Sequence, residues 1–179
     1  MKLSRVWWVL GGLVLIVVAT AYELGFFGKG RVTAITEVSP SSIPELVLSD
    51  LKGERQSLGQ WRGKVLVVNY WATWCAPCRE EMPAFSRLHE RYNSKSVQFV
   101  GISIDDAVKI AEFQKTTPVS YPLLIGDITT MENSAKLGNT LQALPFTAVF
   151  DREGNLAMTK LGRYSEVDLE RHLNELISR

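Results

Sequence analysis

The sequence predicts a single α/β domain built on a mixed β-sheet. Stretches with the apolar pattern of strands alternate with stretches in which apolar residues recur every three or four positions, as in amphipathic helices. One stretch, Val65–Trp71, is mostly apolar and rich in β-branched residues, which is typical of a central strand buried on both faces. The stretch of about 135 residues that follows position 43 is long enough to enclose the core of one ordinary domain.

The N-terminal region predicts a membrane anchor. Lys2 and Arg5 precede an uncharged, apolar stretch over residues 6–22. The length of this stretch reaches the lower limit for a helix that crosses a bilayer, and basic residues ahead of such a stretch hold the N-terminus in the cytoplasm. We therefore expect residues 1–22 to form one transmembrane signal-anchor helix, with the catalytic domain on the periplasmic, extracytoplasmic side of the cytoplasmic (inner) membrane. The Ala-Thr-Ala pattern at residues 19–21 leaves cleavage by a signal peptidase open as an alternative.

A linker is expected over residues 23–43, because this segment is mixed in composition and ends in serine and proline. The folded domain is expected over residues 44–179. Removing Lys2 and Arg5 from the total of 20 basic residues leaves 18, against 19 acidic residues. This balance lacks the basic excess of a nucleic-acid-binding surface, so no nucleic-acid partner is predicted.

The first elements of the domain are a hairpin, the central strand and a helix. Residues 46–58 predict two strands that turn at Lys52-Gly53. The helix after the central strand is expected to begin near Pro77, because proline suits a first helical turn. Its apolar face is marked by four residues at helical spacing: Met82, Phe85, Leu88 and Tyr92.

The second half of the domain continues the alternation of strands and helices. Strands are predicted over residues 97–104 and 123–126, and helices over residues 105–116 and 132–137. Residues 146–151 and 156–161 predict a closing hairpin. Ser165 is expected to cap a last helix with four apolar residues on one face: Leu169, Leu173, Leu176 and Ile177.

Cys75 and Cys78 are the only cysteines in the chain, and they form a C-x-x-C motif. Two thiols at this spacing can interconvert between a dithiol and a disulfide without loss of the fold. Cys75 lies just ahead of the predicted helix, where unpaired backbone N–H groups and the helix dipole favour the thiolate. We therefore expect Cys75 to be the attacking sulfur, and the more enclosed Cys78 to attack the mixed disulfide that Cys75 forms with a substrate.

A zinc site is the main structural alternative for a C-x-x-C motif, and it needs two further thiolate or imidazole ligands. The chain has no second pair of cysteines, and His89 and His172 lack the spacing of a paired ligand set. We therefore predict no metal site, and we expect both histidines to be ordinary surface residues.

The stretch Val67–Pro83, V-V-N-Y-W-A-T-W-C-A-P-C-R-E-E-M-P, resembles the TlpA/ResA-like branch of the thioredoxin superfamily. The resemblance extends to residues 144–154 and covers roughly residues 43–178. It implies a thioredoxin fold, in which helices flank a central mixed sheet. The hairpin at residues 46–58 would be an N-terminal extension, and the segment around residues 123–137 would be the central insertion of this branch. It also implies a thiol:disulfide oxidoreductase that needs no cofactor.

Three residues are candidates for substrate binding. Pro145 would match the cis-proline that faces the redox motif and seats the substrate chain, with Leu144 before it. An X-Pro bond is cis in only about 5–6% of cases, so without the resemblance the Leu144–Pro145 bond would be expected to be trans. Trp74 is adjacent to Cys75 and is a candidate contact for the substrate.

Glu81 is the candidate for proton transfer. It follows Cys78 by three residues, so it projects from the same side of the helix, and it matches an acidic residue near the dithiol of ResA-like proteins. The structural alternative is a solvated glutamate in an early helical turn. Thioredoxins carry a buried aspartate at the position of Asn69, and asparagine cannot take a proton. Glu80 is expected to be the more exposed neighbour.

The sequence thus predicts an extracytoplasmic thiol:disulfide oxidoreductase that reduces disulfides of exported proteins. The resemblance implies a membrane electron donor of the DsbD or CcdA type, and substrates such as apocytochrome c in cytochrome c-type biogenesis or copper-site cysteines. Ala76-Pro77 supplies no basic side chain between the two sulfurs, which predicts a low reduction potential.

Two alternative functions remain open from the sequence. A thiol peroxidase would share the fold, but its P-x-x-x-T-x-x-C signature is missing ahead of Cys75. A non-catalytic copper metallochaperone could hold copper(I) between the two thiolates, since soft ligands suit that ion.

Overall fold

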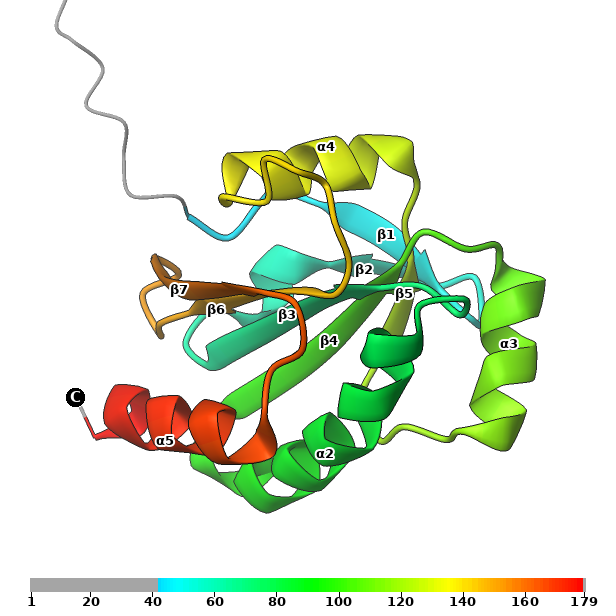
Figure 1. Cartoon of the computed structure of the whole chain (residues 1–179). Coiled ribbons are helices and arrows are strands. Elements are labelled where there is room, and N and C mark those ends of the chain that lie inside the picture. Colours follow the sequence, from blue (N-terminus) through cyan, green and yellow to red (C-terminus); the bar gives the residue numbers. More distant parts are fainter. Residues whose placement is uncertain (1–41, 179) are drawn as a thin grey trace, which may run out of the picture. The chain divides into compact units, whose positions relative to one another are not determined.

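A mixed β-sheet of seven strands organises the part of the chain that the computed structural model describes, residues 42–178 (Figure 1). The strand order across the sheet is 2-1-5-4-3-6-7 in chain numbering. The strands are β1 (Val47–Asp50), β2 (Arg55–Ser57), β3 (Val65–Trp71), β4 (Val97–Ser103), β5 (Leu123–Ile125), β6 (Phe146–Phe150) and β7 (Leu156–Leu161). The helices are α2 (Ala76–Tyr92), α3 (Ala107–Thr116), α4 (Ile128–Lys136) and α5 (Glu166–Ile177), with two short 3-10 helices, η1 (Leu58–Trp61) and η2 (Asn93–Lys95).

The central strand β3 pairs with β4 in parallel and with β6 antiparallel. Every residue of β3 and of β4 is buried, which confirms the prediction of a central strand covered on both faces. The parallel register runs from the pair Val65 and Val97 to the pair Trp71 and Ser103. Both strands therefore end at the same edge of the sheet, and the C-x-x-C motif follows there.

Helices cover both faces of the sheet: α2, α3 and α5 lie on one face, and α4 lies on the other (Figure 1). The predicted apolar stripe of α2 is fully or almost fully buried against the sheet. Removal of this surface from water holds α2 against the sheet, and so fixes the place where the helix begins. The opposite core includes Met131 of α4 and Leu58 of η1.

Most predicted elements are present with shifts of one or two residues. The leading hairpin is confirmed by the antiparallel pairing of β1 with β2, with Gly53 at a φ of +82° in its turn. The helix predicted over residues 105–116 begins at Ala107, because Asp106 acts as its N-cap. The prediction for α4 was wrong at its start: α4 begins at Ile128, four residues early, since Asp127 and Thr130 form a capping box.

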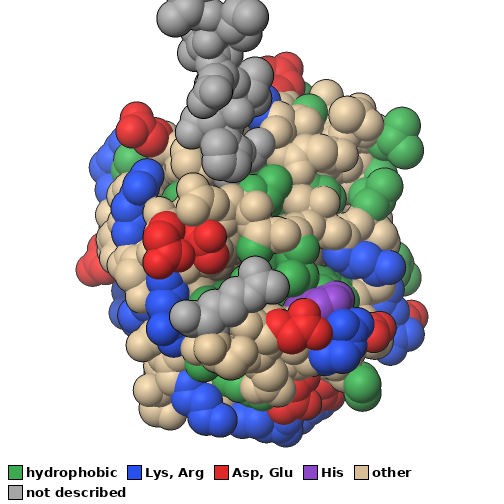
Figure 2. Space-filling view, turned by 90° about the vertical axis from the view of Figure 1, so that its left-hand side faces the viewer, with side chains coloured by type: hydrophobic (Ala, Val, Ile, Leu, Met, Phe, Trp, Pro, Cys, Tyr) green, Lys and Arg blue, Asp and Glu red, His purple; other side chains and the backbone are tan. Residues whose placement is uncertain are grey.

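The predicted anchor at residues 1–22 and most of the predicted linker lie outside the described residues. Within residues 42–178, no helix is long and apolar enough to cross a membrane. Ile43 is buried, and its backbone N–H donates to the Gly154 carbonyl oxygen at 2.9 Å, so the packed region includes this residue. On the face drawn in Figure 2, basic and acidic side chains are interspersed among apolar ones.

Candidate active site

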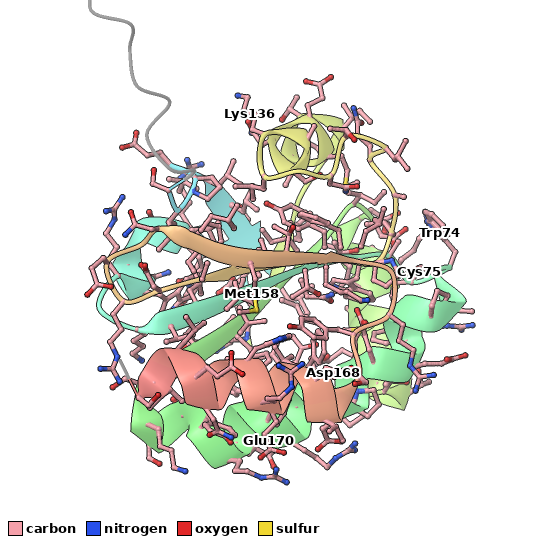
Figure 3. All side chains as sticks on the ribbon, turned by 60° about the vertical axis from the view of Figure 1, so that its left-hand side comes forward. Trp74, Cys75, Lys136, Met158, Asp168 and Glu170 are labelled. Carbon is pink, nitrogen blue, oxygen red and sulfur yellow. A yellow bond between two sulfur atoms is a disulfide. The ribbon has the colours of Figure 1, made fainter. Side chains whose placement is uncertain are left out.

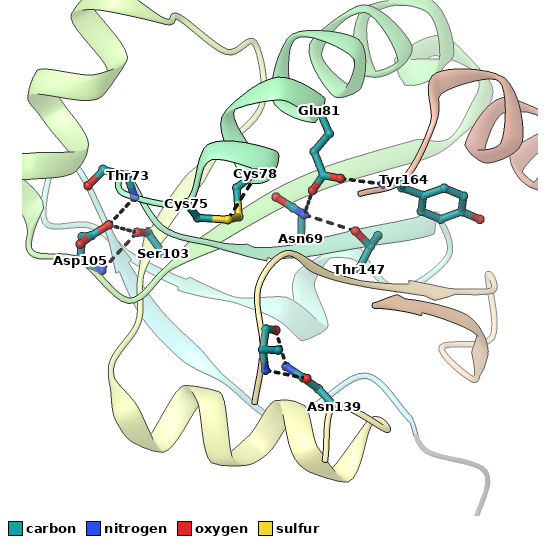
Figure 4. The surroundings of a disulfide bond; sticks show 11 residues. Asn69, Thr73, Cys75, Cys78, Glu81, Ser103, Asp105, Asn139, Thr147 and Tyr164 are labelled. Atoms are coloured by element: carbon teal, nitrogen blue, oxygen red, sulfur yellow. Dashed lines mark hydrogen bonds between the residues drawn. A yellow bond between two sulfur atoms is a disulfide. The ribbon is translucent and has the colours of Figure 1, made fainter. Parts of the chain in front are cut away.

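A disulfide joins Cys75 and Cys78 at the junction of β3 and α2 (Figure 4). Cys75 is the N-cap of α2, and its Sγ accepts a hydrogen bond from the backbone N–H of Cys78 at 3.3 Å. Pro77 lies in the first helical turn, as predicted. Cys75 is 4% exposed and Cys78 is 0% exposed, so the order of exposure is the predicted one, although both residues are buried. An incoming sulfur can therefore reach Cys75 and not Cys78.

Trp74 lies beside the disulfide on the outside of the molecule. The backbone N–H of Cys75 donates to the Ala72 carbonyl oxygen at 3.1 Å, which closes a turn around Trp74. The Trp74 side chain is 67% exposed and projects outward next to Cys75 (Figure 3). An exposed indole next to the reachable sulfur offers a flat apolar surface on which a partner chain can rest.

Pro145 lies next to the redox motif because of the strand pairing. In the antiparallel pair of β3 and β6, Tyr70 is opposite Phe146, so the residue before Phe146 lies at the end of β3 that leads into the motif. The Leu144–Pro145 peptide bond is cis, as the resemblance implies. Leu144 is partly buried and packs against both cores of the domain. The structure thus brings Pro145 to the same sheet edge as Cys75.

Glu81 is buried below the surface, at 1% exposure. Its Oε1 accepts a hydrogen bond from Asn69 Nδ2 at 2.8 Å, and its Oε2 accepts one from the backbone N–H of Tyr164 at 2.8 Å. The structural alternative of a solvated glutamate is therefore wrong. Glu80, by contrast, is exposed, as predicted. In Figure 4 the Glu81 carboxyl group turns from α2 toward the sheet, between Cys78 and Tyr164.

The surroundings of Glu81 make it a group that can exchange a proton at neutral pH. Burial raises the pKa of Glu81 to about 7, against the opposing effects of the Tyr164 N–H, the Asn69 amide and the positive charge of Arg163. A general acid or base is most effective when its pKa lies near the working pH. The carboxyl group follows Cys78 by one helical turn, so the site contains both a redox-active disulfide and a proton carrier.

Asn69 links this carboxyl group to the sheet. Its Nδ2 donates to both Glu81 and the Thr147 hydroxyl, the latter at 3.2 Å. Thr147 lies on β6 and is fully buried. The Asn69 side chain therefore holds the Glu81 carboxyl group in place and, as an amide, takes no proton itself. Sequence reasoning missed Thr147, although it lies two residues after Pro145 in the stretch that carries the resemblance, and it missed Tyr164, which is distant in the chain and belongs to no motif.

Asp105 is a further residue that the sequence reasoning did not assign to the site. It lies two residues after β4, and its Oδ2 accepts a hydrogen bond from the backbone N–H of Thr73 at 2.6 Å. Thr73 belongs to the loop that carries Trp74 and Cys75. A polar residue directly after a buried parallel strand, at the edge that carries the motif, is the signal that could have found it.

The prediction that His89 is a surface residue was wrong. Its side chain is buried on α2 and packs edge-on against Phe99 and Tyr121. Burial lowers the pKa of His89, which favours the neutral ring in this apolar setting. His172 is half-buried on α5, where its Nδ1 contacts the Tyr164 hydroxyl. Among residues 42–178, no three His, Cys, Asp or Glu side chains lie in a group that could hold a metal ion.

The family model described as Redoxin matches residues 39–175 of the chain. The chain belongs to the Redoxin family. Among curated relatives, the thiol-disulfide oxidoreductase ResA of Geobacillus kaustophilus (strain HTA426) is 28% identical over 167 residues, which cover 92% of this chain and 91% of the relative. The thioredoxin-like protein YneN of Bacillus subtilis (strain 168) is 30% identical over 135 residues, which cover 73% of this chain and 76% of the relative.

Solved structures confirm the fold of this Redoxin-family chain. A thioredoxin-related protein from Neisseria meningitidis serogroup B is 38% identical with a TM-score of 0.66, and the match covers 74% of this chain and 99% of that protein. A thiol:disulfide interchange protein from Chlorobium tepidum TLS has a TM-score of 0.71 at 24% identity, covering 79% of this chain and 99% of that protein. The chain is thus a ResA/TlpA-like member of the thioredoxin superfamily and a thiol:disulfide oxidoreductase.

Proposed function

We propose that this oxidoreductase reduces disulfides of exported proteins on the outer side of the cytoplasmic membrane, where residues 1–22 anchor it. The apolar N-terminal stretch and the basic residues before it support the location. Cys75 carries out the first step and Cys78 the second, while Glu81 handles the proton. The proposal depends most on one observation, the buried Glu81 carboxyl group with a pKa of about 7 one turn after Cys78.

The first step is the attack of the Cys75 thiolate on a substrate disulfide. A bond forms between Cys75 Sγ and one substrate sulfur, the substrate disulfide breaks, and the other substrate sulfur leaves as a thiolate. The N–H of Cys78, which contacts Cys75 Sγ in the disulfide form, and the start of α2 stabilise the negative charge of the attacking thiolate. Trp74 and the backbone next to Pro145 hold the substrate chain against the sulfur.

The second step releases the substrate. Cys78 gives its proton to the Glu81 carboxylate, and its sulfur attacks Cys75 Sγ and breaks the mixed disulfide. The substrate leaves with both sulfurs reduced, and Cys75 and Cys78 are joined as they are in the structure. The two electrons come from the dithiol. A membrane dithiol donor of the DsbD or CcdA type restores them, and apocytochrome c or copper-site proteins are the proposed substrates.

The test is a trapping experiment with Cys78→Ser in the native membrane. Without the second thiol, Cys75 should remain in a mixed disulfide with its substrates, which can be isolated on non-reducing gels and identified. Cys75→Ser is the matched control and should trap none of these proteins. Trapped exported proteins that carry cysteine pairs would support the proposal. Equal trapping by both variants, or trapping of cytoplasmic proteins alone, would refute it.

The two alternative functions are tested on the purified chain. A copper metallochaperone would bind one copper(I) ion tightly and would not reduce insulin or a model disulfide. A thiol peroxidase would turn over hydrogen peroxide even with the Cys78→Ser substitution. We expect instead that the wild-type chain reduces insulin, and that Cys78→Ser abolishes this turnover.

A further inference from the structure

Asp105 contacts the loop that carries the attacking cysteine, on the side of the disulfide away from Glu81 (Figure 4). The residue is 8% exposed, and its Oδ2 accepts the backbone N–H of Thr73 at 2.6 Å. Ser103 makes two hydrogen bonds to Asp105, one to the carboxylate and one to the backbone. Its hydroxyl donates to the same Oδ2 at 3.4 Å and accepts the backbone N–H of Asp105 at 3.1 Å.

The pairing of β3 with β4 places these groups opposite each other. The last pair of the ladder is Trp71 with Ser103, and the N–H of Ile104 still donates to the Trp71 carbonyl oxygen at 3.4 Å. Two residues farther on, Thr73 faces Asp105. In a continuing parallel ladder the Thr73 N–H would donate to a backbone carbonyl of the neighbouring strand. Here the Asp105 carboxylate takes the place of that carbonyl, at the point where β3 turns into the loop.

The Thr73 N–H, which Asp105 holds, lies directly before Trp74 and Cys75 in the chain. Trp74 follows Thr73, and the turn closes when the Cys75 N–H donates to the Ala72 carbonyl oxygen. We propose that Asp105 is a positioning residue for thiol–disulfide exchange, which fixes the loop that presents Trp74 and Cys75 to the incoming disulfide. The inference rests on exchange at Cys75, which is part of the proposed function, but not on the direction of electron flow.

Loss of the acceptor has a defined consequence for the loop. The Thr73 N–H would be left without its charge-assisted hydrogen bond, which is stronger than a bond between neutral groups. Trp74 and Cys75 would then sample orientations in which Cys75 Sγ does not face the substrate or the Cys78 N–H. We expect kcat/KM for a protein disulfide to fall about 10-fold, since orientation of reacting groups contributes directly to rate. The apparent pKa of the Cys75 thiol should rise, because its stabilising N–H is less well placed.

The experiment compares Asp105→Ala, Asp105→Asn and Asp106→Asn in the full-length chain. Asp105→Asn removes the charge but keeps a side-chain oxygen that can accept the Thr73 N–H. Asp106→Asn removes a charge at the next position, where the exposed side chain caps α3 and asparagine caps equally well. Insulin reduction gives kcat and KM, the pH dependence of Cys75 alkylation gives the thiol pKa, and circular dichroism verifies that each variant is folded.

The expected result is about a 10-fold loss and a raised thiol pKa for Asp105→Ala, with recovery to within about 2-fold in Asp105→Asn and no change in Asp106→Asn. A folded Asp105→Ala with wild-type kcat/KM and thiol pKa would overturn the inference. The inference would also be overturned if Asp105→Asn were as impaired as Asp105→Ala, because the charge of Asp105 and not its hydrogen bond would then matter. If Asp105→Ala does not fold, Asp105→Asn and Ser103→Ala decide the question. The Ser103→Ala variant should then lose about 3-fold in kcat/KM, because the carboxylate is less well oriented. If the wild-type chain reduces no disulfide, the proposed function itself fails.

Discussion

Glu81→Gln separates the proton-transfer role of Glu81 from its packing role. The substitution keeps the size of the side chain and removes the titratable group. The glutamine side chain can still accept one of the two hydrogen bonds that the carboxylate receives from Asn69 and Tyr164. Any loss of the second bond shifts stability by the same amount at every pH. The titration of Glu81, in contrast, changes stability with pH, so the two effects can be told apart.

The size of this pH effect follows from the raised pKa of Glu81. The folded chain holds the Glu81 proton up to a pKa of about 7, whereas the ordinary value is 4.5. Between these values the folded state binds more protons than the unfolded state, so the free energy of unfolding falls as the pH rises. At about 1.4 kcal/mol for each pH unit, the wild-type chain should lose about 3 kcal/mol between pH 4 and pH 8 through this one group.

The assay is urea unfolding of the oxidised full-length chain at several pH values from 4 to 8. For each chain, the free energy of unfolding is plotted against pH. Subtracting the values of Glu81→Gln from those of the wild type removes the titration of all other groups, and this difference should fall by about 3 kcal/mol from pH 4 to pH 8. Glu80→Gln is the matched control, because Glu80 is exposed and pairs with the exposed Arg163 at 3.1 Å. Its curve should run parallel to that of the wild type.

Activity gives the second measurement on the same variants. The rate of insulin reduction by the wild-type chain should change around pH 7, and Glu81→Gln should lower it by about 100-fold, the lower end of general acid–base effects. Two results would refute the reasoning: a Glu81→Gln unfolding curve parallel to that of the wild type, or equal rates for both chains from pH 5 to pH 9. The first would place the pKa of Glu81 near its ordinary value, and the second would remove its role in exchange.

Four further substitutions test the surface and the core. Trp74→Ala should raise KM for insulin about 10-fold, while leaving the free energy of unfolding within about 0.5 kcal/mol, because the side chain is 67% exposed. Gly101→Ala should cost about 1–3 kcal/mol in urea unfolding, since a Cβ there would lie 2.7 Å from Leu123 Cδ2. Phe85→Ala should cost about 3–5 kcal/mol, because the ring is fully buried, whereas Val108→Ala on the exposed face of α3 should change little. An equal loss of unfolding free energy in Phe85→Ala and Val108→Ala would contradict the assignment of the core.

The sheet and the main helices could be predicted because their signals are local. The run Val65–Trp71 is mostly apolar and rich in β-branched residues, and the observed β3 has these same bounds. The apolar stripe of α2 repeats at helical spacing, and Pro77 marks the first turn. In each case the residues that decide the structure lie within one stretch of the chain. The late start predicted for α4 is the exception, although its Asp127 capping box could have been found.

The surroundings of the site could not be predicted, because they depend on pairs that are distant in the chain. The sequence places Glu81 on the side of the helix that carries Cys78, but it does not reveal that Asn69 of β3 and the Tyr164 N–H before α5 hold the carboxyl group. The contact between Asp105 and Thr73 depends on the register of two parallel strands, which the sequence does not reveal. His89 is buried because Phe99 and Tyr121 come from two other segments.

The raised pKa of Glu81 also has a consequence for the reduced state. In the oxidised chain the disulfide carries no charge, so burial is the main cause of the shift. Reduction adds a thiolate at Cys75, and a nearby negative charge disfavours the ionised form of a carboxyl group. Glu81 should therefore hold its proton more tightly after reduction, and the thiol should ionise less readily while Glu81 is charged. We expect the two groups to titrate as a pair in the reduced chain, so that the pH at which the rate changes belongs to both and not to either residue alone.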